Sequence, residues 1–136
     1  GLDDATFDFL YSSNCLEHVD QPSEAVANWI RVVKPGGTIF FTVPDEDLYE
    51  QGMWPSRYNP DHKWSFTIDK SVATMPRSIN VRPWLQRFRD RVEIVSVELI
   101  DANYDHSLRR VDQTLGEAEA FIEVILTKHP DESHAT

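Results

Sequence analysis

The chain is poor in cysteine, in glycine motifs and in positive charge. Its single cysteine, Cys15, excludes a disulfide within the chain and fits a reducing compartment. Its five glycines form no G-x-G pattern, and the chain has no P-loop, no paired-cysteine zinc motif and no G-x-S-x-G nucleophile elbow. The sequence therefore lacks the short motifs that most directly indicate phosphate binding, structural zinc or serine-hydrolase chemistry.

Acidic residues outnumber basic ones, and the formal net charge is −10. Non-specific binding to nucleic acid depends mainly on neutralising phosphates, so we expect no nucleic-acid partner. No apolar run approaches the roughly 20 residues that span a bilayer, and the acidic N-terminus is unlike a signal peptide. The chain has the composition of an ordinary globular domain, and we expect it to be cytoplasmic, without a membrane partner.

Residues 6–44 have the order of one strand–helix–strand unit. A short aromatic run over 7–11 predicts a buried strand, and a continuous apolar run over 38–43 predicts a strand covered on both faces. Between them, Asp20 can cap a helix and Pro22 suits its first turn. Apolar residues then recur at helical spacing: Val26, Trp29, Ile30 and Val33. Two strands joined by one helix are expected to pair in parallel with a right-handed crossover.

The rest of the chain predicts one more helix and two more strands. Pro83 suits the first turn of a helix whose apolar patch, which includes Trp84 and Phe88, we expect to pack in the core. Residues 92–100 predict a strand, and residues 118–128 predict a last strand with one wetter face. Because no clear helix lies between these two strands, we expect an antiparallel pair. The expected fold class is α/β.

The segment 45–67 between these parts has no sustained period and is long for a loop. Loops of that length in compact domains are usually functional or disordered, and the five aromatic residues here favour order. Within the segment, Asn59-Pro60-Asp61 predicts a turn directly before His62.

These motifs together resemble a known family. The order FDFLYSSNCLEHV followed by RVVKPGGTIFFTVP is similar to the second half of a class I S-adenosylmethionine-dependent methyltransferase domain of the small-molecule type. In that family the first segment is strand four, the K-P-G-G turn follows a helix, and the apolar run is strand five. Segments similar to N-P-D-H-x-x-S-F and D-Q-T-L-G-x-A-x-A-F-I-E occur further along. The resemblance covers residues 6–128 and implies a partial Rossmann-like fold that ends in an antiparallel hairpin.

The resemblance also implies a cofactor, S-adenosylmethionine, held at the end of the first strand. Ser13, Asn14 and Cys15 would line its methionine end, and Leu16 would lie near its adenosine side. From the residues alone, the polar residues 12–14 can instead simply cap a turn.

His18 and His62 are the candidate catalytic residues. By the resemblance, His18 would orient its segment or meet the substrate, and His62 would face a small-molecule methyl acceptor. From the residues alone, both are more simply structural or solvated histidines. A thiol nucleophile from Cys15 with His18 is disfavoured, because a base so near in sequence is not the usual arrangement. No metal is expected from His18, Asp20, His62 and His106, because their spacing matches no metal motif.

The sequence departs from the family pattern at its N-terminus. The family holds most of the cofactor with a Gly-rich loop and an acidic residue from strands one and two, whereas this chain begins at strand four. We therefore expect residues 1–129 to be the C-terminal half of a methyltransferase-like domain, truncated from a longer enzyme, and residues 130–136 to be a flexible tail.

Two other functions stay open. A non-enzymatic half-domain could serve dimerisation or interaction, and a different α/β enzyme, such as half of a dehydrogenase, is a third reading. The strand near residues 7–12 would present an exposed apolar edge, and proteins cover or pair such edges. We therefore expect a homo-oligomer formed through that edge.

Overall fold

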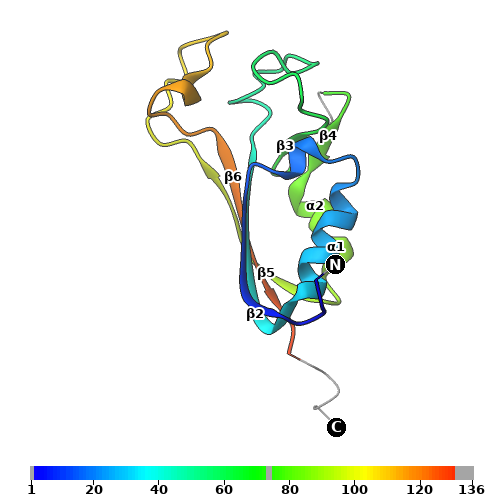
Figure 1. The fold of residues 1–136 in the computed structure, drawn as a ribbon. Coiled ribbons are helices and arrows are strands. Elements are labelled where there is room, and N and C mark those ends of the chain that lie inside the picture. The colour runs from blue at the N-terminus through cyan, green and yellow to red at the C-terminus, as the bar shows by residue number, and fades with distance from the viewer. Residues whose placement is uncertain (1, 73–74, 131–136) are drawn as a thin grey trace.

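A computed structural model of the chain describes residues 2–72 and 75–130 and shows two sheets with helices beside them (Figure 1). The larger sheet has the order β1-β2-β6-β5, with β1 (Phe7–Ser13), β2 (Val33–Pro44), β5 (Val92–Ile100) and β6 (Phe121–Lys128). The smaller sheet pairs β3 (Ser65–Thr67) with β4 (Ser78–Asn80). The helices are α1 (Pro22–Val32) and α2 (Val81–Leu85), and the 3-10 turns are η1 (Leu16–His18), η2 (Gln86–Phe88) and η3 (Gln113–Leu115). The tail predicted from residue 130 onward lies, beyond Pro130 itself, outside the described residues.

The predicted strand–helix–strand unit is confirmed, because β1 pairs with β2 in parallel and α1 connects them. Pro22 occupies the first turn of α1, and Val26 and Ile30 are fully buried. The predicted helix cap is wrong. Gln21 is the N-cap residue and its side chain makes no capping hydrogen bond, whereas Asp20 forms an ion pair with Lys63 at 3.2 Å.

Two glycines carry the chain from α1 into β2. Gly36 has a φ of +82°, a backbone conformation that favours glycine. A Cβ atom on Gly37 would lie 2.5 Å from Val33 Cγ1 and 2.8 Å from the carbonyl oxygen of Asp8, so only glycine fits there. Because β2 already pairs with β1 at Val33, the Pro-Gly-Gly segment is an irregularity inside the strand rather than a turn before it.

The antiparallel C-terminal pair is also confirmed. β6 lies between β2 and β5 and runs antiparallel to both. Its predicted alternation holds: the residues of one face are fully buried, namely Ala120, Ile122, Val124 and Leu126. The predicted core patch holds too, since the rings of Trp84 and Phe88 are buried and pack edge to face with centroids 5.7 Å apart.

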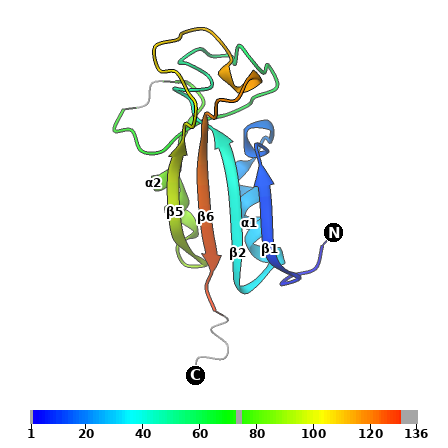
Figure 2. The same cartoon turned by 90° about the vertical axis from the view of Figure 1, so that its left-hand side faces the viewer.

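Helices α1 and α2 cover one face of the larger sheet (Figure 1). Within residues 2–72 and 75–130, no helix covers the opposite face of the sheet (Figure 2). β1 is the strand at one edge of this sheet. Three aromatic side chains of β1 are consequently exposed: Phe7 at 38%, Phe9 at 56% and Tyr11 at 57%. The expected apolar edge is present. The prediction of a buried strand over 7–11 is therefore wrong. The prediction that the second strand is covered on both faces is also wrong, because Phe41 is buried under the helices while Phe40, on the other face, stays partly exposed.

The long loops 45–64 and 101–120 gather at the end of the sheet where β1 and β2 finish (Figures 1 and 2). The short β3–β4 pair, which the sequence did not predict, ties the first of these loops to the sheet, because Asp45 bridges to the fully buried Phe66. Among the helices of the described ranges, each is too short or too polar to cross a bilayer.

Candidate functional site

Polar and ionisable side chains gather where β1 and β2 end. A hollow of about 260 Å³ opens there, lined among others by Asn14, Glu17, His18, Tyr49, Asn59 and His62. In open sheets with parallel strands, ligands bind beyond the carboxyl ends of those strands. The two predicted catalytic histidines, which are far apart in the sequence, therefore line one hollow at the expected place.

The 3-10 turn η1 positions Glu17 and His18. Asn14, just before it, has a φ of +51°, which asparagine tolerates better than most residues, and the chain turns sharply there. Leu16 follows with its side chain in the core at 1% exposure. This anchor leaves Glu17 buried at 1% exposure and His18 half-buried beside it.

The loop 45–64 brings His62 to the same turn. The backbone N–H of Lys63 donates to the carbonyl oxygen of Glu17 at 2.6 Å, which fixes the end of the loop against η1. Asn59 and Asp61 form the predicted turn, in which the N–H of His62 donates to the carbonyl of Asn59 at 3.1 Å. His62 is thereby held 7% exposed at the wall of the hollow.

The start of this loop positions two further groups. The carboxylate of Asp45 accepts the backbone N–H groups of Asp47 and Leu48, both at 3.0 Å, and closes a turn directly after β2. Tyr49 and Glu50 follow this turn. Burial raises the pKa of Asp45 to about 6.

The side chains of Glu17, His18 and His62 converge. Glu17 Oε2 lies 3.8 Å from His18 Nε2 and 4.0 Å from His62 Nε2, and one donor atom from each residue lies within 4.8 Å of the others. The two imidazole rings meet edge to face with centroids 4.9 Å apart. Two imidazoles and one carboxylate, which can each bind a proton or a metal ion, therefore lie next to one another.

A carboxylate holds the far nitrogen of each ring. His18 Nδ1 lies 2.9 Å from Asp61 Oδ2, and His62 Nδ1 lies 3.2 Å from Glu50 Oε1. Glu50 is itself buried and accepts the hydroxyl of Ser56 at 2.6 Å. Because a carboxylate only accepts hydrogen bonds, each neutral ring carries its proton on Nδ1 and turns the lone pair of Nε2 toward Glu17.

The electrostatics of the cluster follow from burial. Burial raises the pKa of Glu17, and a hydrogen bond from its own backbone and the nearby imidazoles act against that rise. Among the described residues, Glu17 Oε1 is a buried polar atom with no hydrogen-bond partner. Burial also raises the pKa of Tyr49 to about 12, helped by the charges of Asp112, Glu50 and Glu17. Tyr49 therefore stays a neutral phenol beside His62, with ring centroids 5.3 Å apart.

The residues predicted to bind the cofactor lie at the end of β1. Ser13 and Cys15 are exposed, and Asn14 lines both the histidine hollow and a neighbouring hollow of about 250 Å³ that also includes Ser13 and Thr42. These polar groups are thus accessible at the end of β1, whereas the side chain of Leu16 is 1% exposed and packs in the core.

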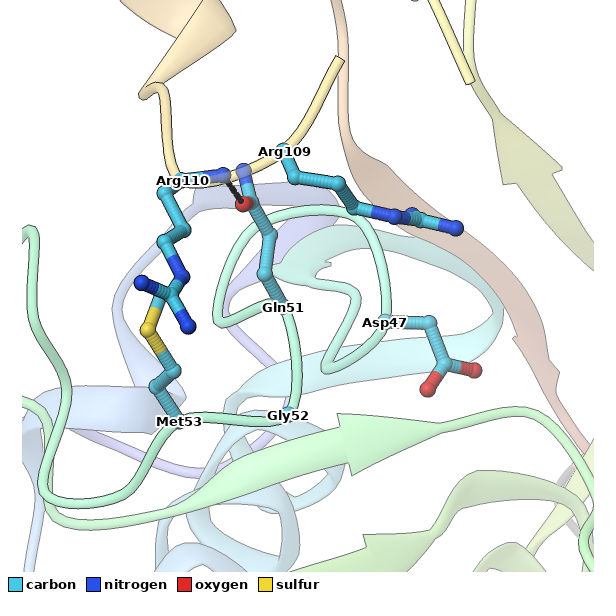
Figure 3. Close-up of a pocket in the computed structure, with 6 residues that line it drawn as sticks. All are labelled: Asp47, Gln51, Gly52, Met53, Arg109 and Arg110. Atoms are coloured by element: carbon cyan, nitrogen blue, oxygen red, sulfur yellow. Dashed lines mark hydrogen bonds between the residues drawn. The ribbon is translucent and has the colours of Figure 1, made fainter. Parts of the chain in front are cut away.

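A larger hollow, of about 600 Å³, lies between the loop 47–53 and residues 109–110 (Figure 3). Gln51 joins its two walls, because its Oε1 accepts the N–H of Arg110 at 2.6 Å and its Nε2 donates to the carbonyl of Val111 at 2.7 Å. Asp47, its acidic lining residue, is paired with Lys70 at 2.9 Å. Since its lining includes neither a histidine nor a predicted site residue, we assign the candidate site to the smaller hollow.

Sequence reasoning selected His18 and His62 but missed the buried acids that meet them, Glu17 and Glu50. Glu17 is adjacent to His18 in sequence, which was a usable signal, whereas no local pattern links Glu50 to His62. Of the other residues considered for a metal, two pair elsewhere: Asp20 with Lys63 and His106 with Asp101.

Comparison with known proteins gives sequence matches over part of the chain. Residues 1–41 match the sequence model of a family described as "Methyltransferase domain". Uncharacterized proteins from two strains of Mycobacterium tuberculosis are 41% identical to the chain over 44 residues. That segment is 32% of this chain and 15% of each relative, so the match covers only a small part of these proteins.

Solved structures match over nearly the whole chain. An S-adenosylmethionine-dependent methyltransferase from Methanosarcina mazei is 16% identical with a TM-score of 0.58, covering 96% of this chain and 63% of the other. A chain in the complex between the Haloferax volcanii Trm112 methyltransferase activator and a methyltransferase is 15% identical with a TM-score of 0.56, covering 95% and 56%. This chain thus spans less than two thirds of either, and at these identities the likeness concerns the fold.

Proposed function

We propose that the chain is part of a class I methyltransferase domain and takes part in S-adenosylmethionine-dependent methyl transfer to a small-molecule acceptor. The match of residues 1–41 to the methyltransferase family and the likeness in fold to solved methyltransferases support this proposal. The observation that carries the proposal is the cluster of Glu17, His18 and His62 facing a hollow at the ends of β1 and β2. Acceptor and cofactor meet at this end of the sheet in the proposed function.

The cluster offers the chemistry that an acceptor needs. S-adenosylmethionine, when bound, supplies an electrophilic methyl group. An acceptor hydroxyl or amine must lose a proton when it is methylated, and the Nε2 lone pair of His18 or His62 can take that proton. Glu17 then stabilises the imidazolium that forms, and the neutral phenol of Tyr49 can orient the acceptor. Holding the acceptor in line supplies most of the remaining rate.

We assign cofactor contact to Ser13, Asn14 and Cys15, with the backbone of Leu16. The position of these residues supports the assignment: Ser13, Asn14 and Cys15 are accessible at the end of β1, and Asn14 lines the acceptor hollow. The chain's own glycines supply no G-x-G loop. In this proposal the other side of the cofactor is held by residues beyond these 136, from the same polypeptide or from a partner.

Calorimetric titration with S-adenosylhomocysteine tests the proposal without knowledge of the acceptor. Because residues outside these 136 hold the other side of the cofactor in this proposal, we expect binding by the wild type to be weaker than micromolar. Binding should be weaker again by at least about tenfold in Ser13→Tyr, whose ring would fill the hollow beside Asn14. Ser71→Tyr, at an exposed position, is the matched control and should bind as the wild type does. A folded protein that does not bind the ligand would contradict the proposal for this chain.

A second function is favoured by the exposed edge of β1. Its aromatic residues Phe7, Phe9 and Tyr11 form an unpaired apolar edge in the described structure, and such edges promote pairing with another chain. A non-enzymatic domain that dimerises or docks through this edge would need no cofactor. That the Haloferax methyltransferase occurs in a complex with an activator supports a protein partner for this fold. A monomer in light scattering at high concentration, with S-adenosylhomocysteine bound, would reject this second function.

A further inference from the structure

Glu17, His18 and His62 direct electron-rich atoms at one another, and such atoms repel. With Nδ1 of each ring directed at a carboxylate, both Nε2 atoms face Glu17 Oε2, so three electron-rich atoms point into one space. The separations of 3.8 and 4.0 Å are too long for hydrogen bonds. The remaining oxygen, Glu17 Oε1, is buried and has no hydrogen-bond partner among the described residues. A cation bound between the three atoms would relieve this arrangement.

The separations suit a metal ion in size. Two donor atoms bound to one zinc-type ion at about 2.1 Å stand about 3 to 4 Å apart, depending on the bond angle. The two distances from Glu17 Oε2 fall in that range, and the third pair needs at most a small approach of the rings. A buried carboxylate is normally paired or bound to a metal, because burial otherwise penalises its charge.

We propose that Glu17, His18 and His62 form a binding site for one divalent transition-metal ion of the zinc class. Two imidazoles and one carboxylate are a known ligand set for Zn²⁺ and for Fe²⁺. Mg²⁺ and Ca²⁺ prefer all-oxygen ligands and fit this set poorly. The site stands on its geometry and does not depend on methyl transfer.

The surroundings of the three ligands support the assignment. Metal-binding histidines almost always donate their other N–H to a carboxylate, carbonyl or water, which fixes the ring and raises its basicity. Asp61 holds His18 in this way at 2.9 Å, and Glu50 holds His62 at 3.2 Å. Ser56 in turn fixes Glu50 at 2.6 Å. Both outer carboxylates are thus already in the places that a metal site requires.

Three protein ligands leave coordination positions open toward the hollow. A catalytic zinc typically keeps such a position for water or substrate and lowers the pKa of the group bound there. Tyr49 and Asn59 line the same hollow and would contact a molecule bound at the open position. The ligand class that fits is a small molecule with a hydroxyl or amine group, and with the ion bound the histidines act as ligands rather than as bases.

The test is direct ion binding to metal-free protein. After treatment with a chelator and its removal, the protein is titrated with ZnCl₂ by calorimetry and with CoCl₂ by visible absorption. We expect one ion per chain and a Co²⁺ spectrum of four or five coordination. His18→Ala and His62→Ala should each weaken binding by at least about a hundredfold, and the outer-carboxylate variant Glu50→Gln by about 10–100-fold.

His106→Ala is the matched control, because His106 also pairs with a carboxylate, that of Asp101 at 3.2 Å, but lies outside the cluster. Circular dichroism of each variant separates lost binding from lost folding, and Glu17→Gln, nearly the same shape, replaces any variant that does not fold. Nitrogen NMR of the wild type needs no variant: Zn²⁺ should shift the ring resonances of His18 and His62. Absence of stoichiometric binding, or loss of binding in His106→Ala instead, would overturn the site and leave the S-adenosylhomocysteine result unaffected.

Discussion

Asp45 closes the turn that directs the loop 45–64 over the candidate site. From its burial we predict how the stability of the protein depends on pH. Asp45 is 5% exposed, and burial raises the pKa of its carboxyl group from 3.8 to about 6. A shift of about two units corresponds to about 3 kcal/mol between the two protonation states. Because the raised pKa belongs to the folded state, the stability from this group is fully present below about pH 4 and is lost as the pH rises through about 6.

The substitution Asp45→Asn removes the charge and keeps an oxygen that can accept the N–H groups of Asp47 and Leu48. The variant should therefore gain stability relative to the wild type as the pH rises. Between about pH 5 and about pH 7.5 the gain should be about 1.4 kcal/mol, or about tenfold in the folding equilibrium. Urea unfolding followed by the fluorescence of the four tryptophans measures it at both pH values.

Two control variants separate charge from hydrogen bonding. Asp90→Asn, at an exposed position, should show a pH-independent difference from the wild type. Asp45→Ala loses the two hydrogen bonds and should be less stable than Asp45→Asn at every pH, by about 1–3 kcal/mol. If the difference between Asp45→Asn and the wild type is constant with pH, or falls as the pH rises, the reasoning about this buried carboxyl group is refuted.

Three further predictions concern the fold and its edge. Gly37→Ala should destabilise the protein by at least about 2 kcal/mol, because the new Cβ atom would clash with backbone atoms. Gly116→Ala, whose new Cβ atom would have its nearest contact at 3.7 Å, should cost less than about 1 kcal/mol. Urea unfolding measures the free energy of unfolding of both variants. Leu85→Ala, fully buried, should lose about 2–5 kcal/mol in the same assay, and retained stability would mean that α2 does not pack as described. Phe9→Lys should turn an oligomer into a monomer in light scattering, whereas Val95→Lys, exposed on β5, should not.

Much of the fold followed from local patterns in the sequence. The helical stripe over Val26, Trp29 and Ile30, with Pro22 at its start, determined α1, whereas Val33, which shares the helical spacing, is the first residue of β2. The alternation over 118–128 determined which face of β6 is buried. These patterns are readable because side-chain direction repeats with a fixed period in helices and strands. The K-P-G-G segment likewise indicated a special backbone conformation, which the φ of Gly36 confirms.

The tertiary structure decided what depends on contacts between distant segments. Burial of 7–11 and 38–43 could not be predicted, because it depends on which faces of the sheet the helices cover, and α1 and α2 both lie on one face. The three-residue strands β3 and β4 carry too short a pattern to predict. They pair with each other across a stretch of loop, and the bridge from Asp45 to Phe66 joins β3 to the end of β2.

The candidate site divides in the same way. The sequence alone placed His18 after a strand and His62 after a turn, and both positions are local properties. That the two rings converge on Glu17, with Glu50 behind one and Asp61 behind the other, was decided by the loop 45–64 folding back onto η1. A hydrogen bond from the backbone N–H of Lys63 to the carbonyl oxygen of Glu17 fixes this contact. Because nearly every residue carries these backbone groups, the bond could not be predicted from the sequence.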